Sequence, residues 1–167
     1  KLVEKGDIVK KGQKIAESKA FLSAPVHSPV SGKVLSVENH LLPVNGKVLT
    51  IIIENDFKEI EEEYEKIENY REKTKEELLD KIRSMGVVGQ GGAAFPTHIK
   101  LNPPADTKID TLIINGAECE PYLNSDNRVM IERANEVIEG IKIMLHILKI
   151  EKAVIGIEKN KKEAIEI

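Results

Sequence analysis

Cysteine, tryptophan and long apolar runs are scarce or absent in this chain, and each shortage excludes a class of protein. Tryptophan is missing, aromatic residues make up 4% of the 167 residues, and Cys119 is the single cysteine. One cysteine cannot build an internal disulfide framework or ligate an iron–sulfur cluster by itself. No apolar run approaches the roughly 20 residues of a membrane-spanning helix. A net charge of −3 and few aromatic residues also argue against a nucleic-acid-binding surface.

Residues 1–55 have the pattern of a small β domain. Short runs of alternating apolar and polar residues are separated by turn residues, and the β-branched run 48–53 predicts the last strand. The following stretch, residues 56–73, is rich in glutamate and poor in apolar positions. We expect it to be an acidic, solvated linker, part of which could be helical.

From residue 74 the pattern becomes helical. Thr74 and Glu77 have the spacing of a capping box, and Gly86 stands where a C′ glycine ends a helix. Further along, Asp126 is a candidate N-cap, and Asn160 is a candidate N-cap for a helix that begins near the end of the chain. We therefore expect the sequence to continue beyond Ile167.

Two continuous apolar runs, residues 111–115 and 153–157, predict buried strands of a parallel sheet. An apolar stripe over residues 137–148 predicts a core helix between them. This alternation of helices and strands predicts an incomplete α/β domain over residues 74–167, preceded by the all-β domain.

The glycine-rich stretch 86–100 is the most informative part of the sequence. Four of the eleven glycines fall within residues 86–92. Glycine lets backbone N–H groups face a ligand, and a following helix N-terminus favours an anion, so the stretch suits a phosphate group. The spacing fits G-x-G-x-x-G/A, but a helix precedes it, where a dinucleotide-binding turn needs a strand, and no P-loop Gly-Lys-Ser/Thr follows. The alternative is a surface loop whose glycines only allow positive φ angles.

A second polar segment, residues 115–122 with the sequence NGAECEPY, lies directly beyond the predicted strand 111–115. Ligands of parallel sheets bind at the carboxyl ends of the strands. Glu118 and Glu120 can accept hydrogen bonds from ligand hydroxyl or N–H groups, or they can simply face solvent. Cys119 is expected to be a small buried residue, because no activating base lies nearby in the sequence. The four histidines lack acidic or thiol partners at metal-ligand spacing, so no metal site is expected.

The β domain resembles biotinyl and lipoyl carrier domains, which are flattened barrel-sandwich hybrids with a modified lysine at a hairpin tip. Lys19 lies near that position. However, Ser18-Lys19-Ala20 matches neither the Met-Lys-Met of biotin carriers nor the Asp-Lys-Ala of lipoyl carriers. We therefore expect the carrier fold without the modification, and a swinging-arm carrier acylated at Lys19 is the weakest of three hypotheses.

Three ordered motifs together resemble one protein family. They are Gly89-x-Gly91-Gly92-Ala93-x-Phe95-Pro96-Thr97-x-x-Lys100, Asn115-Gly116-x-Glu118-x-Glu120-Pro121 and Glu139-Gly140. They resemble the flavin-bearing, NADH-oxidising subunit of respiratory complex I. The carrier-like domain in front and the form NGAECEPY resemble more closely the RnfC family, which supplies the C subunit of the Rnf-type ion-translocating ferredoxin:NAD oxidoreductase.

This resemblance implies a truncated Rossmann-like α/β domain that binds FMN and NAD(H), with the cofactor carrying the chemistry and no catalytic side chain in this segment. The implied cofactor-binding residues are Gly89, Gly91, Gly92 and Lys100 around the phosphate and ribityl groups, and Asn115, Glu118 and Glu120 on the flavin and nicotinamide side. Two positions depart from complex I. Ala117 replaces an acidic residue, which removes one polar contact, and Ala94 replaces a usual glycine, which keeps the backbone farther from the ligand.

The resemblance also implies partners. They would be the other subunits of a membrane-bound electron-transport complex, NAD(H) directly and ferredoxin indirectly, with a peripheral location on the inner face of the cell membrane. The iron–sulfur clusters would lie beyond Ile167, so these residues alone would be inactive. The alternative from a different class is a non-catalytic scaffold with a vestigial nucleotide site, and FMN binding separates the two hypotheses.

Overall fold

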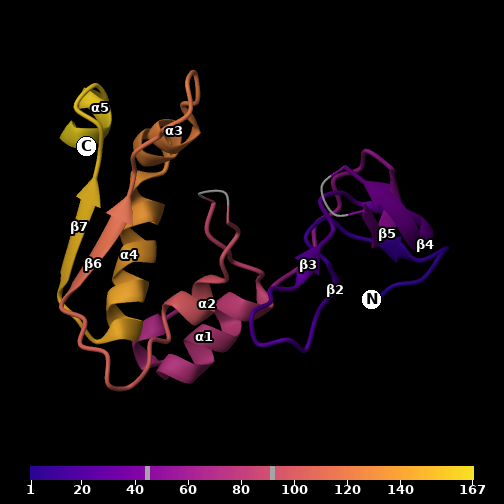
Figure 1. Ribbon diagram of the computed structural model, residues 1–167, viewed down its shortest axis with the longest axis horizontal. Helices are drawn as coiled ribbons and strands as arrows, with labels where there is room; N and C mark the ends of the chain where they lie inside the picture. Colours follow the sequence, from indigo (N-terminus) through magenta and orange to yellow (C-terminus); the bar gives the residue numbers. More distant parts are fainter. Residues whose placement is uncertain (44–45, 91–92) are drawn as a thin grey trace. The chain divides into compact units, whose positions relative to one another are not determined.

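The computed structural model describes residues 1–43, 46–90 and 93–167, and the chain divides into two compact units (Figure 1). The first unit consists of Lys1–Glu68 and Asp80–Ile99, and the second of Asn69–Leu79 and Lys100–Ile167. The domain boundaries expected from the sequence stay a prediction.

Within the described residues, the β part of the first unit has five short to medium strands. They are β1 (Ile8–Val9), β2 (Lys14–Ala16), β3 (Val26–His27), β4 (Gly32–Leu42) and β5 (Gly46–Asn55). β4 pairs antiparallel with β1 and β5, and β2 pairs antiparallel with β3. The core of this part contains Val3, Val9, Ile15 and Val34, of which none is more than 4% exposed. The predicted small β domain is therefore confirmed, and the predicted strand 48–53 lies within β5.

Gly32, the first residue of β4, is required by the close approach of β5. A Cβ added at this position would lie 1.9 Å from the carbonyl oxygen of Glu54 and 3.2 Å from the Cα of Asn55. Gly32 and Asn55 are partners in the β4–β5 register. Any side chain at position 32 would therefore push the two strands apart where their pairing begins.

The acidic stretch after β5 is extended and contacts the β part. Lys11 forms a parallel bridge with Glu61, and its ammonium group makes an ion pair with Glu59. The Tyr64 hydroxyl donates a hydrogen bond to the carbonyl oxygen of Gly12. Helical structure appears only at the 3₁₀ turn η1 (Tyr70–Glu72). Side-chain and backbone contacts thus hold residues 59–64 against the β part, whereas η1 belongs to the second unit.

Helix α1 (Lys75–Ser84) begins and ends as the sequence predicts. The Glu77 N–H donates to the Thr74 hydroxyl at 3.2 Å, and the Thr74 N–H donates to the Glu77 carboxylate at 2.8 Å, which is the capping box. At the other end Gly86 has a φ of 67°. Its N–H donates to the Arg83 carbonyl, and the Val87 N–H donates to the Ile82 carbonyl. These two bonds form a Schellman motif with Gly86 at C′.

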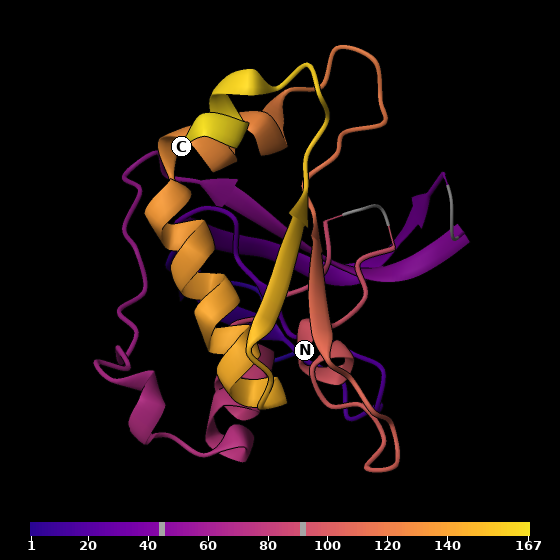
Figure 2. The ribbon, with the colours of Figure 1, turned by 90° about the vertical axis from the view of Figure 1, so that its left-hand side faces the viewer.

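The second unit contains a pair of parallel strands with helices beside it. Besides η1 and the first half of α1, it contains β6 (Thr111–Asn115), α3 (Ser125–Glu132), α4 (Ala134–Leu148), β7 (Lys152–Gly156) and α5 (Lys162–Glu166). β6 and β7 pair in parallel from Thr111↔Lys152 to Asn115↔Gly156. In both ribbon views α4 runs along the two strands (Figure 2), and it buries Ile141 and Ile147. The predicted parallel pairing and core helix are confirmed, with β7 shifted by one residue. The prediction that both strands are buried is wrong, because Ile113 of β6 is 73% exposed and Val154 of β7 is 46% exposed in this two-stranded sheet.

Two predicted helix caps are wrong. α3 has Asn124 at the N-cap position, without a side-chain cap bond, so Asp126 lies inside the first turn. α5 has Lys161 at the N-cap position, again without a side-chain cap bond, so Asn160 lies outside the helix. At α3 the N–H groups of Asp126 and Asn127 are instead met by the carboxylate of Glu118. None of the described helices is long and apolar enough to cross a membrane.

Replacing Thr74 by alanine should destabilise the protein by about 1 kcal/mol, because the first N–H groups of α1 lose their side-chain acceptor. Urea unfolding followed by circular dichroism measures this loss. Thr107→Ala is the control, since Thr107 is exposed and lies outside any helix or strand. An equal loss in both variants would contradict the capping role.

Alanine at two glycines should have opposite effects on stability. Gly32→Ala should lower the urea midpoint strongly, because its Cβ would overlap the Glu54 carbonyl. Gly140→Ala should raise stability by about 1 kcal/mol, because nothing lies within 4 Å of an added Cβ and glycine is unfavourable inside a helix. A Gly32→Ala variant as stable as the unmodified chain would show that β4 and β5 can separate at no cost.

Candidate functional site

The glycine-rich stretch forms a loop whose two ends are joined by backbone hydrogen bonds. Val88 and Pro96 make an antiparallel bridge, the Gly89 N–H donates to the Phe95 carbonyl at 2.9 Å, and the Thr97 N–H donates to the Val87 carbonyl at 3.1 Å. This closed neck fixes where the loop starts and ends. Gly91 and Gly92 lie outside the described residues.

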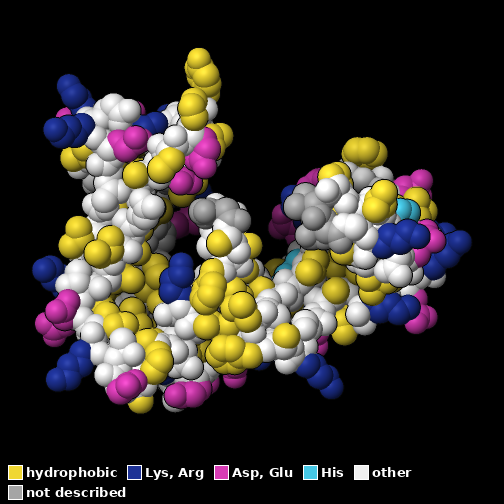
Figure 3. All heavy atoms as spheres, in the orientation of Figure 1, with side chains coloured by type: hydrophobic (Ala, Val, Ile, Leu, Met, Phe, Trp, Pro, Cys, Tyr) yellow, Lys and Arg dark blue, Asp and Glu magenta, His cyan; other side chains and the backbone are white. Residues whose placement is uncertain are grey.

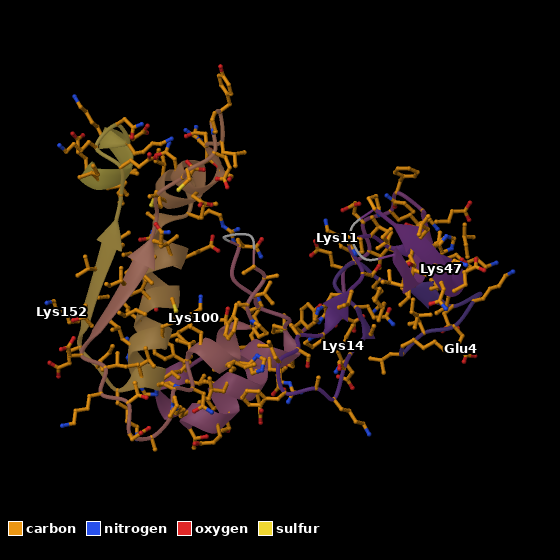
Figure 4. All side chains as sticks on the ribbon, viewed as in Figure 1. Glu4, Lys11, Lys14, Lys47, Lys100 and Lys152 are labelled. Carbon is orange, nitrogen blue, oxygen red and sulfur yellow. The ribbon has the colours of Figure 1, made fainter. Side chains whose placement is uncertain are left out.

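Two further residues of this stretch, Ala94 and Lys100, are described by the structure. Ala94 has a φ of 48°, a left-handed conformation that favours glycine. The backbone here therefore keeps the conformation expected of a glycine, although the chain carries alanine. Lys100 is exposed and is the last residue of the short helix α2 (Thr97–Lys100), which follows the loop directly (Figure 4).

The second predicted segment lies where the sequence places it, at the carboxyl end of β6. Asn115 is the last residue of the strand, and its side-chain oxygen accepts the Ala117 N–H at 3.1 Å. Its amide nitrogen is therefore the atom left to donate to a ligand. The next residue, Gly116, is closely packed, because an added Cβ would lie 2.8 Å from the sulfur of Met130 and 3.1 Å from the carbonyl of Gly156. The hydrogen bond from the Ala117 N–H therefore holds the Asn115 side chain, and Met130 of α3 packs closely against the next residue, Gly116.

The carboxylate of Glu118 caps α3. Its side chain is 4% exposed, and it accepts hydrogen bonds from the N–H groups of Asp126 at 2.9 Å and Asn127 at 3.4 Å. Lys161 brings its ammonium nitrogen to 3.4 Å. Burial raises the pKa of the Glu118 carboxyl, but the two N–H donors and Lys161 outweigh burial, so the pKa lies below its usual value. The role of Glu118 toward a ligand stays a prediction, because its observed contacts are within the protein.

Sequence reasoning missed Lys161. Besides its ion pair with Glu118, it donates a hydrogen bond to the side-chain oxygen of Asn124 at 3.0 Å. Its side chain is only 17% exposed. These contacts join the loop after β6, the start of α3 and the turn before α5. Nothing local in the sequence signals them, because Lys161 lies 37 residues beyond Asn124.

The rest of the loop after β6 is open to solvent. Glu120 and Cys119 are exposed, so the expectation of a buried cysteine is wrong. Tyr122 is fully exposed and has a φ of 67°. Of the two carboxylates expected at this strand end, Glu120 is therefore the one that presents its side chain to solvent. Among the residues that the structure describes, no group of three or more His, Cys, Asp or Glu side chains could hold a metal ion.

The comparisons with known proteins assign both loops to one family. Residues 82–167, just over half of the chain, match the family described as the Nuo51 FMN-binding domain. The chain belongs to the Nuo51 FMN-binding family. The matched residues of this Nuo51-family chain contain the whole glycine loop and the whole segment after β6. Residues 1–58 match the RnfC barrel sandwich hybrid domain, so the carrier-like fold expected for the β part is confirmed.

Relatives of this Nuo51-family chain are components of oxidoreductase complexes. It is 49% identical to the C subunit of the proton-translocating ferredoxin:NAD(+) oxidoreductase complex of Clostridium ljungdahlii, and 40% identical to the C subunit of the Na(+)-translocating ferredoxin:NAD(+) oxidoreductase complex of Acetobacterium woodii. It is 44% identical to the C subunit of the ion-translocating oxidoreductase complex of Actinobacillus succinogenes. These alignments cover 98% to 99% of the chain but only 36%, 38% and 24% of the three relatives. The resemblance to the C subunit of these complexes is therefore confirmed over the chain.

The Glu118 cap should make stability depend on pH. Because the folded-state pKa is lowered, the ionised carboxylate stabilises the protein above its unfolded value of about 4.5, and this contribution is lost as the pH falls through the lower folded-state pKa. Glu118→Gln should therefore be less stable than the unmodified chain at pH 7, with a difference that shrinks below pH 4.5. Thermal unfolding from pH 3 to 7 measures it, and a difference that stays constant over this range would contradict the ionised cap.

Proposed function

We propose that this chain is the flavin module of an Rnf-type oxidoreductase, which binds FMN and passes electrons between NAD(H) and iron–sulfur clusters elsewhere in the complex. The observation that carries the proposal is the match to the Nuo51 FMN-binding domain over the residues that hold both polar segments. The names of the relatives, which belong to complexes acting with ferredoxin and NAD(+), support the same class of reaction.

The chemistry of the glycine loop suits the phosphate of FMN. Gly89, Gly91 and Gly92 allow the backbone to approach a dianion without Cβ atoms in the way, and Lys100 supplies an ammonium group. The bridge between Val88 and Pro96 closes the two ends of the loop. The backbone N–H groups between these ends are the ones we propose to bind the phosphate. The left-handed conformation at Ala94 adds to this support, because it turns the backbone as a glycine would.

The segment after β6 suits the rest of the ligand. The Asn115 amide nitrogen can donate to a ribityl hydroxyl or to a ring acceptor, while the exposed Glu120 carboxylate can accept from the hydroxyls of the nicotinamide ribose. Glu118 contributes by holding this loop on α3. FMN, when bound, supplies a ring that accepts a hydride from NADH, and the protein only orients the two rings and the polar groups around them.

The whole complex provides what these residues do not contain. The chain spans 36% and 38% of the two ferredoxin:NAD(+) oxidoreductase relatives. We propose that the later residues complete the Rossmann-like sheet that β6 and β7 begin, and that they carry the iron–sulfur clusters. The other subunits would then provide the link to ferredoxin and the attachment to the inner face of the membrane. Charges of both signs are interspersed on the visible face (Figure 3), which suits docking to protein partners better than to nucleic acid.

An FMN titration followed by flavin fluorescence tests the proposal, with riboflavin as the phosphate-free control. FMN should bind with saturation and riboflavin far more weakly. The titration should be repeated on the full-length protein, because the later residues can contribute to the site. Absence of FMN binding in both proteins would overturn the proposal and favour the scaffold hypothesis.

Two substitutions locate the phosphate within the loop. Gly91→Val should weaken FMN binding by placing a branched side chain where the phosphate approaches. Lys100→Ala should cost roughly 1.5–3 kcal/mol of binding free energy, because a charge-assisted contact is lost. Lys108→Ala is the matched control, since Lys108 is an exposed lysine outside any helix or strand. Unchanged FMN affinity in Gly91→Val would contradict the loop assignment.

A further inference from the structure

The last turn of α1 lies against the β part within the first unit. The carbonyl groups at a helix C-terminus lack partners inside the helix. In α1 the Schellman bonds satisfy the carbonyls of Ile82 and Arg83. The carbonyl of Ser84 instead accepts a hydrogen bond from His27 of β3, whose Nε2 lies 3.1 Å away. A carbonyl oxygen only accepts, so Nε2 carries the proton in this contact.

The same histidine touches the residue at which the chain turns out of α1. A Cβ added to Gly86 would lie 2.9 Å from the Nδ1 of His27 and 3.0 Å from the carbonyl oxygen of Pro25. The turn is therefore pressed against the β part both by the imidazole ring and by the backbone just before β3. Only glycine fits there, because the space and the φ of 67° exclude a side chain.

One further contact holds this half of α1 on the first unit, and a cleft lies beside it. The Lys81 ammonium donates to the Glu65 carbonyl at 2.6 Å, which ties the helix to the extended acidic stretch. An open cleft of about 350 Å³ lies beside the His27 contact, with walls from β2, the β2–β3 loop and the last turns of α1. Lys14, at the start of β2, lines this cleft and is labelled in Figure 4.

The contact lies close to the neck of the glycine loop along the chain. Gly86 is followed at once by Val87, whose carbonyl accepts the Thr97 N–H, and by Val88, which bridges to Pro96. The backbone has no flexible spacer between the His27 contact and the neck. A displacement of the Gly86 backbone would therefore move Val87 and Val88, and with them their partners Thr97 and Pro96 at the other end of the loop.

We propose that the barrel sandwich hybrid domain supports the glycine loop, and that His27 is the residue that positions it for phosphate binding. His27 acts through Ser84 and Gly86 and touches no ligand. The inference rests on the proposed FMN site for its functional part. The support of the loop by β3 is a property of the protein alone and can be measured without FMN.

The test compares two substitutions of similar size in this chain. His27→Gln keeps an N–H donor near the position of Nε2, whereas His27→Leu removes it. Hydrogen exchange of residues 86–90 is measured without FMN, and the FMN dissociation constant is measured separately. His27→Leu should speed exchange about tenfold or more and raise the dissociation constant by a similar factor. His27→Gln should stay within about threefold of the unmodified chain in both measurements.

His40→Leu is the control, because His40 belongs to β4 and its Nε2 lies 3.4 Å from the Glu38 carboxylate of the same strand.

Gly86→Ala is the second variant, since its Cβ would disturb the contact with His27 without touching the β core. It should weaken FMN binding as His27→Leu does. Equal exchange rates in His27→Leu and the unmodified chain would overturn the inference, as would equal losses in His27→Leu and His27→Gln. If neither the unmodified chain nor the full-length protein binds FMN, the proposed function fails, while the exchange rates still decide whether His27 supports the loop.

Discussion

The backbone groups at helix ends need partners, and this requirement positions both segments of the proposed site. At the end of α1 the carbonyl of Ser84 accepts a hydrogen bond from His27. Gly86 occupies the C′ position, where its N–H donates to the Arg83 carbonyl, and these contacts fix the backbone just before the glycine loop. At the start of α3 the free N–H groups are met by the buried carboxylate of Glu118. In each case the partner comes from another element. The helix ends thus connect elements that would otherwise be independent.

The glycine loop and the segment after β6 both depend on these contacts at helix ends. The two ends of the glycine loop are joined by the bridge between Val88 and Pro96, directly after the end of α1. In the segment after β6, the two carboxylates divide their tasks. Glu118 is buried and holds the loop, whereas Glu120 is exposed and available to a ligand. The carrier-like β domain lacks a carrier motif, but its strand β3 contacts the end of α1 at Gly86. In our proposal, this contact is the domain's role.

The sequence was sufficient for features set by neighbouring residues. The capping box, the C′ glycine and the parallel strands β6 and β7 all follow from local spacing and apolar runs, and all are confirmed. It was insufficient where a partner comes from far along the chain. Asp126 looked like a cap because its side chain is of the right type, yet the α3 cap is a carboxylate eight residues earlier. His27 and Lys161 carried no local signal, because hydrogen bonds between distant segments leave no period in the sequence.

The position of Lys161 has a consequence for how the protein is made. The ribosome delivers β6 and its polar loop first, then two helices and β7, and only then the lysine that neutralises Glu118 and binds Asn124. Until residue 161 emerges, the loop carries a carboxylate without its ammonium partner. The strand end at β6 therefore acquires its final form only after β7 has been made, and a nascent chain that stalls before this turn presents the loop without its counter-ion.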